Sequence, residues 1–307
     1  MKVFVTGATG VLGRRAVPRL REAGHEVTAV SRTTQADRRL REVGAEPVRL
    51  DLFDPVAVAA AAGGHDAVVN LATRIPPAAR AWRRRAWREN DRLRQEAATN
   101  LAAAATDAEV LVQESIAFLY ADHGAERIVE SDRVRPGAAT ASALAAEAAA
   151  HACTRDGRRG IVLRFGQFVA PDARHTRDLV AMAQRGRLAM LGDPAGYVSL
   201  LAGDDAARAV VAALQAPAGT YNVAEDEPAT RAEHASSLAA AVGRTVRPLP
   251  AWLGRSRLAE PLTRSHRLST ARFRHATGWQ PHVPEIRADW ERVLGSLDEG
   301  RKEAEHA

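Results

Sequence analysis

Short apolar runs alternate with longer stretches of helical composition along the first half of the chain. Between the runs lie helical stretches at about 13–23, 78–105 and 140–153. Strands that alternate with helices in this way form parallel sheets covered on both faces, so the pattern predicts an α/β fold with a doubly wound parallel sheet. The runs expected to be strands are 2–6, 25–31, 47–50, 67–71, 109–113 and 160–163.

The pattern changes after Gly166, where prolines and glycines interrupt shorter elements. A helix at about 204–215 and a strand at about 221–223 are expected to return to the main sheet. The remainder, from about residue 226, has the composition of a small α-rich lobe. We therefore expect a main domain of residues 1–165 plus about 200–225, and a smaller C-terminal lobe of about 166–199 and 226–307.

Composition narrows the class of protein. Of the 307 residues, 46% are hydrophobic and 26% charged, which is typical of a globular chain. We find no apolar run of membrane-spanning length and no secretory signal, so no membrane partner and a cytoplasmic location are expected. The single Cys153 excludes a disulfide framework and a multi-cysteine metal site. The histidines show no metal spacing, and no metal is predicted.

Arginine supplies nearly all of the positive charge. Only Lys2 and Lys302 are lysines among the 43 basic residues, which is typical of codon bias toward arginine. The formal net charge is +6, which is modest for 307 residues. The sequence therefore predicts no nucleic-acid partner.

Three glycines follow the first predicted strand at a spacing of three. They allow a tight turn, bring backbone N–H groups close to a pyrophosphate, and let the next helix pack on the sheet. A glycine-rich turn without a ligand is the alternative. The position between a strand and a helix favours a dinucleotide site. The residues assigned to it are Gly7, Thr9, Gly10, Val11, Leu12 and Gly13.

The end of the second predicted strand bears on the type of nucleotide. An NAD site usually places an acidic residue there, to bind the ribose hydroxyls. This chain has Arg32 instead, which suits a 2′-phosphate and favours NADPH/NADP, unless Arg32 is one more surface arginine. Further along the sheet, Asp51 and Leu52 are expected near the adenine. Leu71, Ala72 and Thr73 are expected under its ribose.

These motifs and others further along the chain resemble those of one family. The chain resembles an extended or atypical short-chain dehydrogenase/reductase of the NAD-dependent epimerase/dehydratase type. The resemblance implies a Rossmann-type domain with a smaller substrate-binding lobe. It is carried by Thr6-Gly-x-x-Gly-x-x-Gly13, Asp51-Leu52, Asn70-Leu71-Ala72, Ser115-x-x-x-x-Tyr120, Leu163-Arg164-Phe165, Asp204-Asp205-Ala206, Tyr221-Asn222-Val223 and Gly278-Trp279-x-Pro281.

One departure from the family pattern concerns its acid–base chemistry. Such enzymes carry a Tyr-x-x-x-Lys pair on the helix after the fifth strand, where the tyrosine exchanges the proton and the lysine holds the ribose. Aligned on Glu147, this chain has Ala139 and Ala143 in those two places. The serine of the family falls on Ser115 counted from the strand, and on Ile116 counted from Tyr120. Ser115 is the candidate catalytic residue.

The resemblance assigns further residues to the two ligands. Gln113 and Phe165 are expected beside the cofactor. The expected substrate, a small aromatic ketone, is assigned to Ile116, Phe118, Gln167, Phe168 and Trp82. For Trp82 and the phenylalanines, ordinary packing is the alternative role.

Three functions are open to a chain without the Tyr-x-x-x-Lys pair. Within the family the chain resembles ketoreductases of aromatic polyketides, which implies NADPH-dependent reduction of an angucyclinone C-7 ketone in antibiotic biosynthesis. A phenol beside the carbonyl would then supply the proton. The alternatives are a non-catalytic NADP(H)-binding sensor or scaffold and, less favoured because it needs the same tyrosine, a nucleotide-sugar epimerase. The sequence makes no prediction of oligomeric state.

Overall fold

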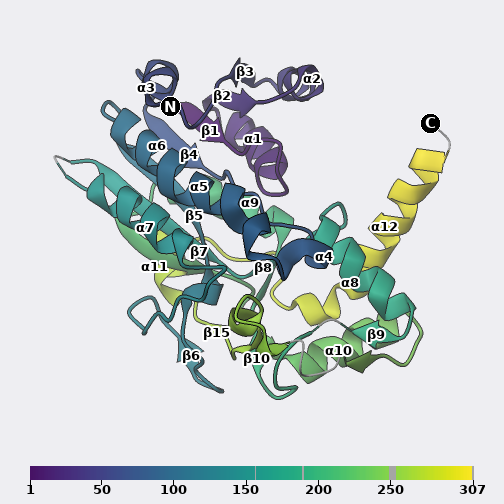
Figure 1. Ribbon diagram of the computed structural model, residues 1–307. Helices are drawn as coiled ribbons and strands as arrows, with labels where there is room; N and C mark the ends of the chain where they lie inside the picture. Colours follow the sequence, from purple (N-terminus) through teal and green to yellow (C-terminus); the bar gives the residue numbers. More distant parts are fainter. Residues whose placement is uncertain (156, 189, 249–253, 306–307) are drawn as a thin grey trace.

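The centre of the protein is a seven-stranded parallel sheet (Figure 1). The computed structural model describes residues 1–155, 157–188, 190–248 and 254–305. The strand order is β12-β7-β5-β4-β1-β2-β3, so the chain winds outward in both directions from β1 and β4. The strands are β1 (Lys2–Thr6), β2 (Glu26–Ser31), β3 (Glu46–Arg49), β4 (Ala67–Asn70), β5 (Val110–Ile116), β7 (Arg159–Phe165) and β12 (Gly219–Val223).

Helices cover both faces of this sheet, as the alternating pattern predicts. On one face, α1 (Gly13–Glu22), α2 (Thr34–Glu42) and α9 (Gly203–Ala213) pack over the inward side chains of β1, β4, β5 and β7. On the other face lie α3 (Pro55–Ala62), α6 (Ala98–Ala104) and α7 (Ser142–Ala152). The predicted doubly wound α/β fold is confirmed, and β12 does return to the sheet edge beside β7.

The expected helix of residues 78–105 is broken into several parts. They are α4 (Ala78–Ala81), a 3₁₀ turn (Arg84–Trp87), α5 (Arg88–Arg92), a π-helical turn (Leu93–Ala97) and α6. The indole nitrogens of Trp82 and Trp87 donate to the carbonyls of Ala79 and Ala81, at 2.9 and 2.8 Å. These bonds satisfy the last carbonyls of α4 and end it.

A second group of elements gathers to one side of the sheet (Figure 1). Helices α8 (Arg174–Gln184), α10 (Arg231–Ala241) and α12 (Trp290–Glu305) share an apolar cluster with β8 (Gln167–Val169) and β11 (Leu200–Ala202). Helix α11 (Ala271–Thr277) packs instead against β12, through Phe273 and Tyr221. The division into two domains at the expected boundaries stays a prediction.

Several two-stranded ladders join these parts. They involve β6 (Arg127–Ile128), β9 (Arg187–Leu188), β10 (Tyr197–Val198), β13 (Ala229–Thr230), β14 (Arg247–Pro248) and β15 (Arg267–Leu268). Among the helices that the structure describes, none has the length and apolar character needed to cross a bilayer.

Candidate nucleotide-binding and reductase site

The glycine loop lies at the point where the sheet changes its direction of winding, between β1 and β4. Ligands of doubly wound sheets bind at this crevice, outside the carboxyl ends of the strands. Gly7 has a φ of +68°, and a Cβ there would stand 2.4 Å from the carbonyl carbon and oxygen of Leu71. A Cβ on Gly13 would stand 2.2 Å from the Gly7 oxygen. The loop therefore fits a pyrophosphate cradle and tolerates no side chain at these two glycines.

Two arginines flank the adenosine side of the crevice. Arg32 follows β2 and Arg74 follows β4, with side chains 71% and 55% exposed. Both approach Glu89 of α5, at 3.9 and 3.6 Å. These are loose, exposed ion pairs, which contribute little to stability. The guanidinium groups are therefore available to a phosphate, which would bind them more strongly than one carboxylate does.

A row of buried polar side chains crosses the sheet beneath the loop. The Thr6 hydroxyl donates to Asn70 Oδ1 at 2.6 Å, and Asn70 Nδ2 donates to Gln113 Oε1 at 2.8 Å. Asn70 Oδ1 also accepts from the backbone N–H of Ala72 at 3.2 Å. The row fixes the end of β4 under the glycine loop. It also occupies the Gln113 amide, whose nitrogen donates to the Glu114 carbonyl.

Ser115 belongs to a second buried network. Its hydroxyl donates to Glu147 of α7 at 2.5 Å. Arg164 of β7 meets the same carboxylate through two nitrogens, at 2.9 and 2.7 Å, and its guanidinium stacks on Tyr120. The hydroxyl proposed for catalysis is thus engaged in holding α7 to the sheet. Burial raises the pKa of Tyr120 to about 12, and its hydroxyl donates to Asn222, so Tyr120 is not poised to release a proton.

A second buried ion pair, that of Arg94 and Glu114, joins the π-helical turn to β5. Arg94 Nη2 lies 3.2 Å from both carboxylate oxygens of Glu114. The side chains are 1% and 9% exposed. Burial raises the pKa of Glu114 above its ordinary value, against the opposing charge of Arg94. The pair lies at the carboxyl end of β5, beside the crevice.

The end of β5 and the turn after it, residues 116–119, present alternate residues to the surface. Ile116 and Phe118 are half-buried, whereas Ala117 and Leu119 are buried. The ring of Phe118 meets that of His266 edge to face at 5.9 Å. Ala139, just before α7, is 3% exposed, and Ala143, in its first turn, is 1% exposed.

The other assigned residues are spread around this region. Phe165 lies in the core and packs on the half-buried Phe168, with ring centroids 5.3 Å apart. Gln167 is half-buried on β8. Asp51 is exposed and accepts from the backbone of Phe53, and Leu52 accepts from Asn100. Trp82 is 62% exposed and carries Arg83 over its ring.

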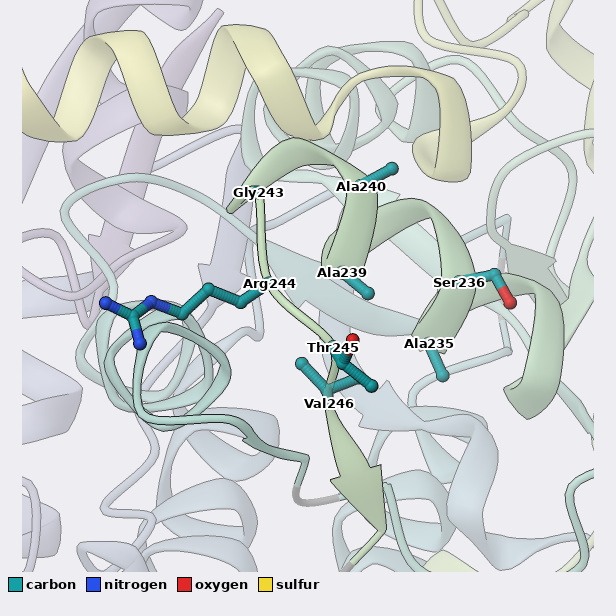
Figure 2. A pocket seen from close by; sticks show the side chains of 8 residues that line it. All are labelled: Ala235, Ser236, Ala239, Ala240, Gly243, Arg244, Thr245 and Val246. Carbon is teal, nitrogen blue, oxygen red and sulfur yellow. The ribbon is translucent and has the colours of Figure 1, made fainter.

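The structure also has a hollow far from these residues in the chain (Figure 2). It has a volume of about 620 Å³ and is formed by the C-terminal half of α10 and the turn at 243–246. Its lining is mostly small side chains from one helix, without converging titratable groups, so it is not the candidate site. Within the described ranges, no three His, Cys, Asp or Glu side chains gather as metal ligands would.

Sequence reasoning missed the four arginine–carboxylate pairs described above. Glu114 offered a signal, because it is a charged residue inside an otherwise apolar strand and such residues are rarely buried unpaired. Arg94 and Arg74 offered none in so arginine-rich a chain.

Comparison with known proteins agrees with this geometry. Residues 3–224 match the model of the NAD dependent epimerase/dehydratase family. The chain is 35% identical over 319 residues to a 3-diazoavenalumate denitrifying reductase of a Streptomyces species, covering 94% of this chain and 98% of that protein. It is 28% identical over 247 residues to an epimerase family protein of Mycobacterium bovis, covering 79% of each.

Solved structures show the same architecture. The human epimerase family protein SDR39U1, solved with NADPH, superposes with a TM-score of 0.79 at 26% identity, covering 97% of this chain and 100% of that one. The UDP-N-acetylglucosamine 4-epimerase of Bacillus cereus superposes with a TM-score of 0.75 at 19% identity, covering 97% and 99%, and shares the fold. Together with the glycine cradle, these likenesses make the crevice an NAD(P) site, and the chain belongs to the NAD dependent epimerase/dehydratase family.

Proposed function

We propose that this protein is an NADPH-dependent reductase of an aromatic substrate that needs no proton from the protein. The observation that carries the proposal is the contrast between the two halves of the site. The three glycines of the cradle are present, whereas alignment on Glu147 puts Ala139 and Ala143 where the family carries its tyrosine and lysine. The hydroxyl of Ser115, the remaining candidate, already donates a hydrogen bond to Glu147.

The chain's own residues would bind and orient the two reactants. NADPH, when bound, supplies a hydride. The loop at 7–13 would hold the pyrophosphate, and Arg32 with Arg74 the 2′-phosphate. Ile116 and Phe118 would present an apolar wall to a flat ring and exclude water from it. Orientation of this kind supplies a large share of a rate enhancement without any acid.

The substrate we favour is an angucyclinone-type polyketide with a phenol beside its C-7 ketone, met in antibiotic biosynthesis. The carbonyl carbon accepts the hydride, the π pair moves to oxygen, and that oxygen takes the proton of the neighbouring phenol. The phenolate is delocalised and regains a proton from water. A positioned acid contributes about 10²–10⁴-fold to such reactions, so a substrate-borne phenol recovers what the alanines omit.

A second candidate substrate is an aryl diazo compound, favoured by the 35% identical relative named as a denitrifying reductase. An arenediazonium carbon accepts a hydride, the C–N bond breaks, and N₂ leaves with the electron pair of that bond. The products are the arene and N₂, and no proton is consumed. Both candidates thus explain why an acid–base pair is dispensable.

One set of incubations tests the proposal. Purified protein with NADPH is given an aryl ketone bearing a neighbouring phenol, the methyl ether of that ketone, or an aryl diazo compound. NADPH absorbance and product mass are followed. We expect reduction of the phenolic ketone, with the methyl ether slower by about 10²-fold or more. Turnover of the diazo compound alone would select the second candidate.

The remaining functions give other results. Tight binding of NADPH with no oxidation by any of the three compounds would refute the reductase proposal and indicate a sensor or scaffold. Interconversion of a nucleotide sugar, with no net consumption of cofactor, would indicate an epimerase.

A further inference from the structure

The buried pair of Arg94 and Glu114 is incomplete. A single nitrogen of Arg94 serves both carboxylate oxygens at 3.2 Å, beyond the roughly 2.7–2.9 Å usual for charged partners. Nε and Nη1 of Arg94 are buried, and neither has a hydrogen-bond partner among the described residues. Glu114 has acceptor positions to spare, because a carboxylate offers about four. A buried donor without a hydrogen-bond partner costs free energy, so we infer that a ligand or water completes this pair.

The neighbouring pair of Glu147 and Arg164 is more complete. There two nitrogens meet two oxygens at 2.9 and 2.7 Å, and Ser115 adds a third bond. The guanidinium also stacks on Tyr120, 4.9 Å from the ring centroid. Among the described residues Arg164 lacks a partner only at Nη1, whereas Arg94 lacks one at both Nε and Nη1, so the pair of Arg94 and Glu114 is the more open of the two.

The open pair lies on the path of a dinucleotide across the sheet. Strand β4 pairs with β5 only as far as Asn70 and Gln113, so Glu114 is the first residue of β5 beyond that ladder. Glu114 and the half-buried Ile116 extend to the same side of the strand, because side chains alternate. A nucleotide that starts at the glycine loop of β1 and crosses the end of β4 next meets the end of β5. The Glu114 side chain is 9% exposed.

The chemistry of the pair suits a vicinal diol. Two neighbouring hydroxyls donate to one carboxylate, and their oxygens accept from a guanidinium. In dinucleotide-binding domains an acidic residue binds the ribose hydroxyls on the adenosine side. In this chain that place, at the end of β2, is taken by Arg32, and the buried acid on β5 stands three strands away, on the other side of β1. The turn that bears Arg94 packs against α7, where the family keeps its ribose-binding lysine and this chain has Ala143.

We propose that Glu114 binds the two hydroxyls of the nicotinamide-side ribose, with Arg94 behind it as a positioning residue. The charge of Arg94 favours the ionised form of the carboxylate, and its guanidinium aims the carboxylate from the buried side. The cation that the family takes from α7 is supplied here from the π-helical turn, and π turns recur at functional sites. The inference rests on nucleotide binding and not on the identity of the reduced substrate.

A series of three ligands tests this placement by calorimetric binding, without turnover. The first is 2′,5′-ADP, which has no second ribose. The second is 2′-phospho-ADP-ribose, which has that ribose but no nicotinamide, and the third is NADPH. In Glu114→Gln and Arg94→Met we expect the Kd of the second and third ligands to rise at least about tenfold, and that of 2′,5′-ADP to stay unchanged. Glu96→Gln is the matched control, because it opens the exposed Arg92–Glu96 pair, whose members each lie two residues from Arg94.

Equal weakening of all three ligands would overturn the inference, because it would show damage to the fold or to the glycine cradle. Unchanged affinity for all three would overturn it as well. If both variants fail to fold, wild-type protein still decides. An NADPH analogue without the hydroxyls of the nicotinamide-side ribose should bind about tenfold more weakly than NADPH, and equal affinity for the two would refute the placement.

Discussion

Replacement of Gly7 by alanine should strongly weaken nucleotide binding through two separate effects. The first is backbone strain, because φ is +68° and a side chain costs roughly 1–2 kcal/mol in that region. The second is a collision, because the new Cβ would lie 2.4 Å from the Leu71 carbonyl and 2.7 Å from the Ala72 nitrogen. Ordinary contact begins at 3.4 Å, so the loop and the end of β4 must separate by about 1 Å.

That separation acts on the ligand more than on the fold. The loop at 7–13 holds a pyrophosphate by backbone N–H groups, which a shift of 1 Å takes out of register. In catalysis a displacement of that size costs about 10²-fold in rate, and we apply the same factor to binding at a fixed cradle. We therefore expect the Kd for NADPH to rise about a hundredfold in Gly7→Ala, with a loss of unfolding free energy of about 2–4 kcal/mol from strain and displaced packing.

Gly24 supplies the control. Its φ is +83°, yet a Cβ there would meet nothing within 4 Å. Gly24→Ala should therefore lose only about 1–2 kcal/mol of stability and bind NADPH as wild type does. Calorimetric titration with NADPH and thermal unfolding of both variants are the measurements. If Gly7→Ala matches Gly24→Ala in both, the contact between the loop and β4 does not shape the nucleotide site.

Three further changes probe other parts of the structure. Asn70→Ala leaves Thr6 and Gln113 without their buried hydrogen-bond partner, and we expect the free energy of unfolding in urea to fall by about 2–4 kcal/mol. A fall under about 1 kcal/mol would mean that the row is not a stabilising network. Burial lowers the pKa of His266 to about 4 in the folded protein. Below pH 6.5 this histidine therefore gains a proton in the unfolded protein and not in the folded one, so stability falls as pH drops from about 6.5 to 4. His266→Gln should remove about 3 kcal/mol of that fall, and a melting-temperature curve as steep as that of wild type over this pH window would contradict the assignment. Glu89→Gln frees Arg32 and Arg74 from their shared carboxylate, and NADPH should bind a few-fold more tightly while NADH does not; equal gains for both nucleotides would remove the arginines from the 2′-phosphate site.

The sheet was predictable because its signals are local. Most strands of the main sheet are short apolar runs, and the glycine spacing marks the turn into α1. Strand β1 begins and ends at the predicted residues, 2 and 6. Strand β5 is longer than expected and runs on to Ile116, because the polar residues 113–115 find partners in the interior instead of ending the strand.

The polar contacts of the site were not predictable, because they join residues distant in sequence. Glu147 meets Ser115 and Arg164 only after three elements are packed together. The sequence could not tell whether Ser115 faced a substrate or another side chain, since periodicity places a residue on a face and not in a hydrogen bond. Arg94 lies on a π turn, an irregularity that shifts every later side chain of the helix and leaves no periodic trace.

The pairing of Glu147 with Arg164 also sets an order on synthesis of the chain. The helix that carries Glu147 is complete at Ala152, but its carboxylate has no cation until β7 has been made. At a synthesis rate of about 5–20 residues per second, the interval between Glu147 and Arg164 lasts roughly one to three seconds. A nascent chain ending between them would carry a helix whose Glu147 can accept from Ser115 but has no cation. The counter-charge of this carboxylate therefore waits for the arrival of one arginine, and β12, more than fifty residues later, closes a sheet edge that the nascent chain leaves open.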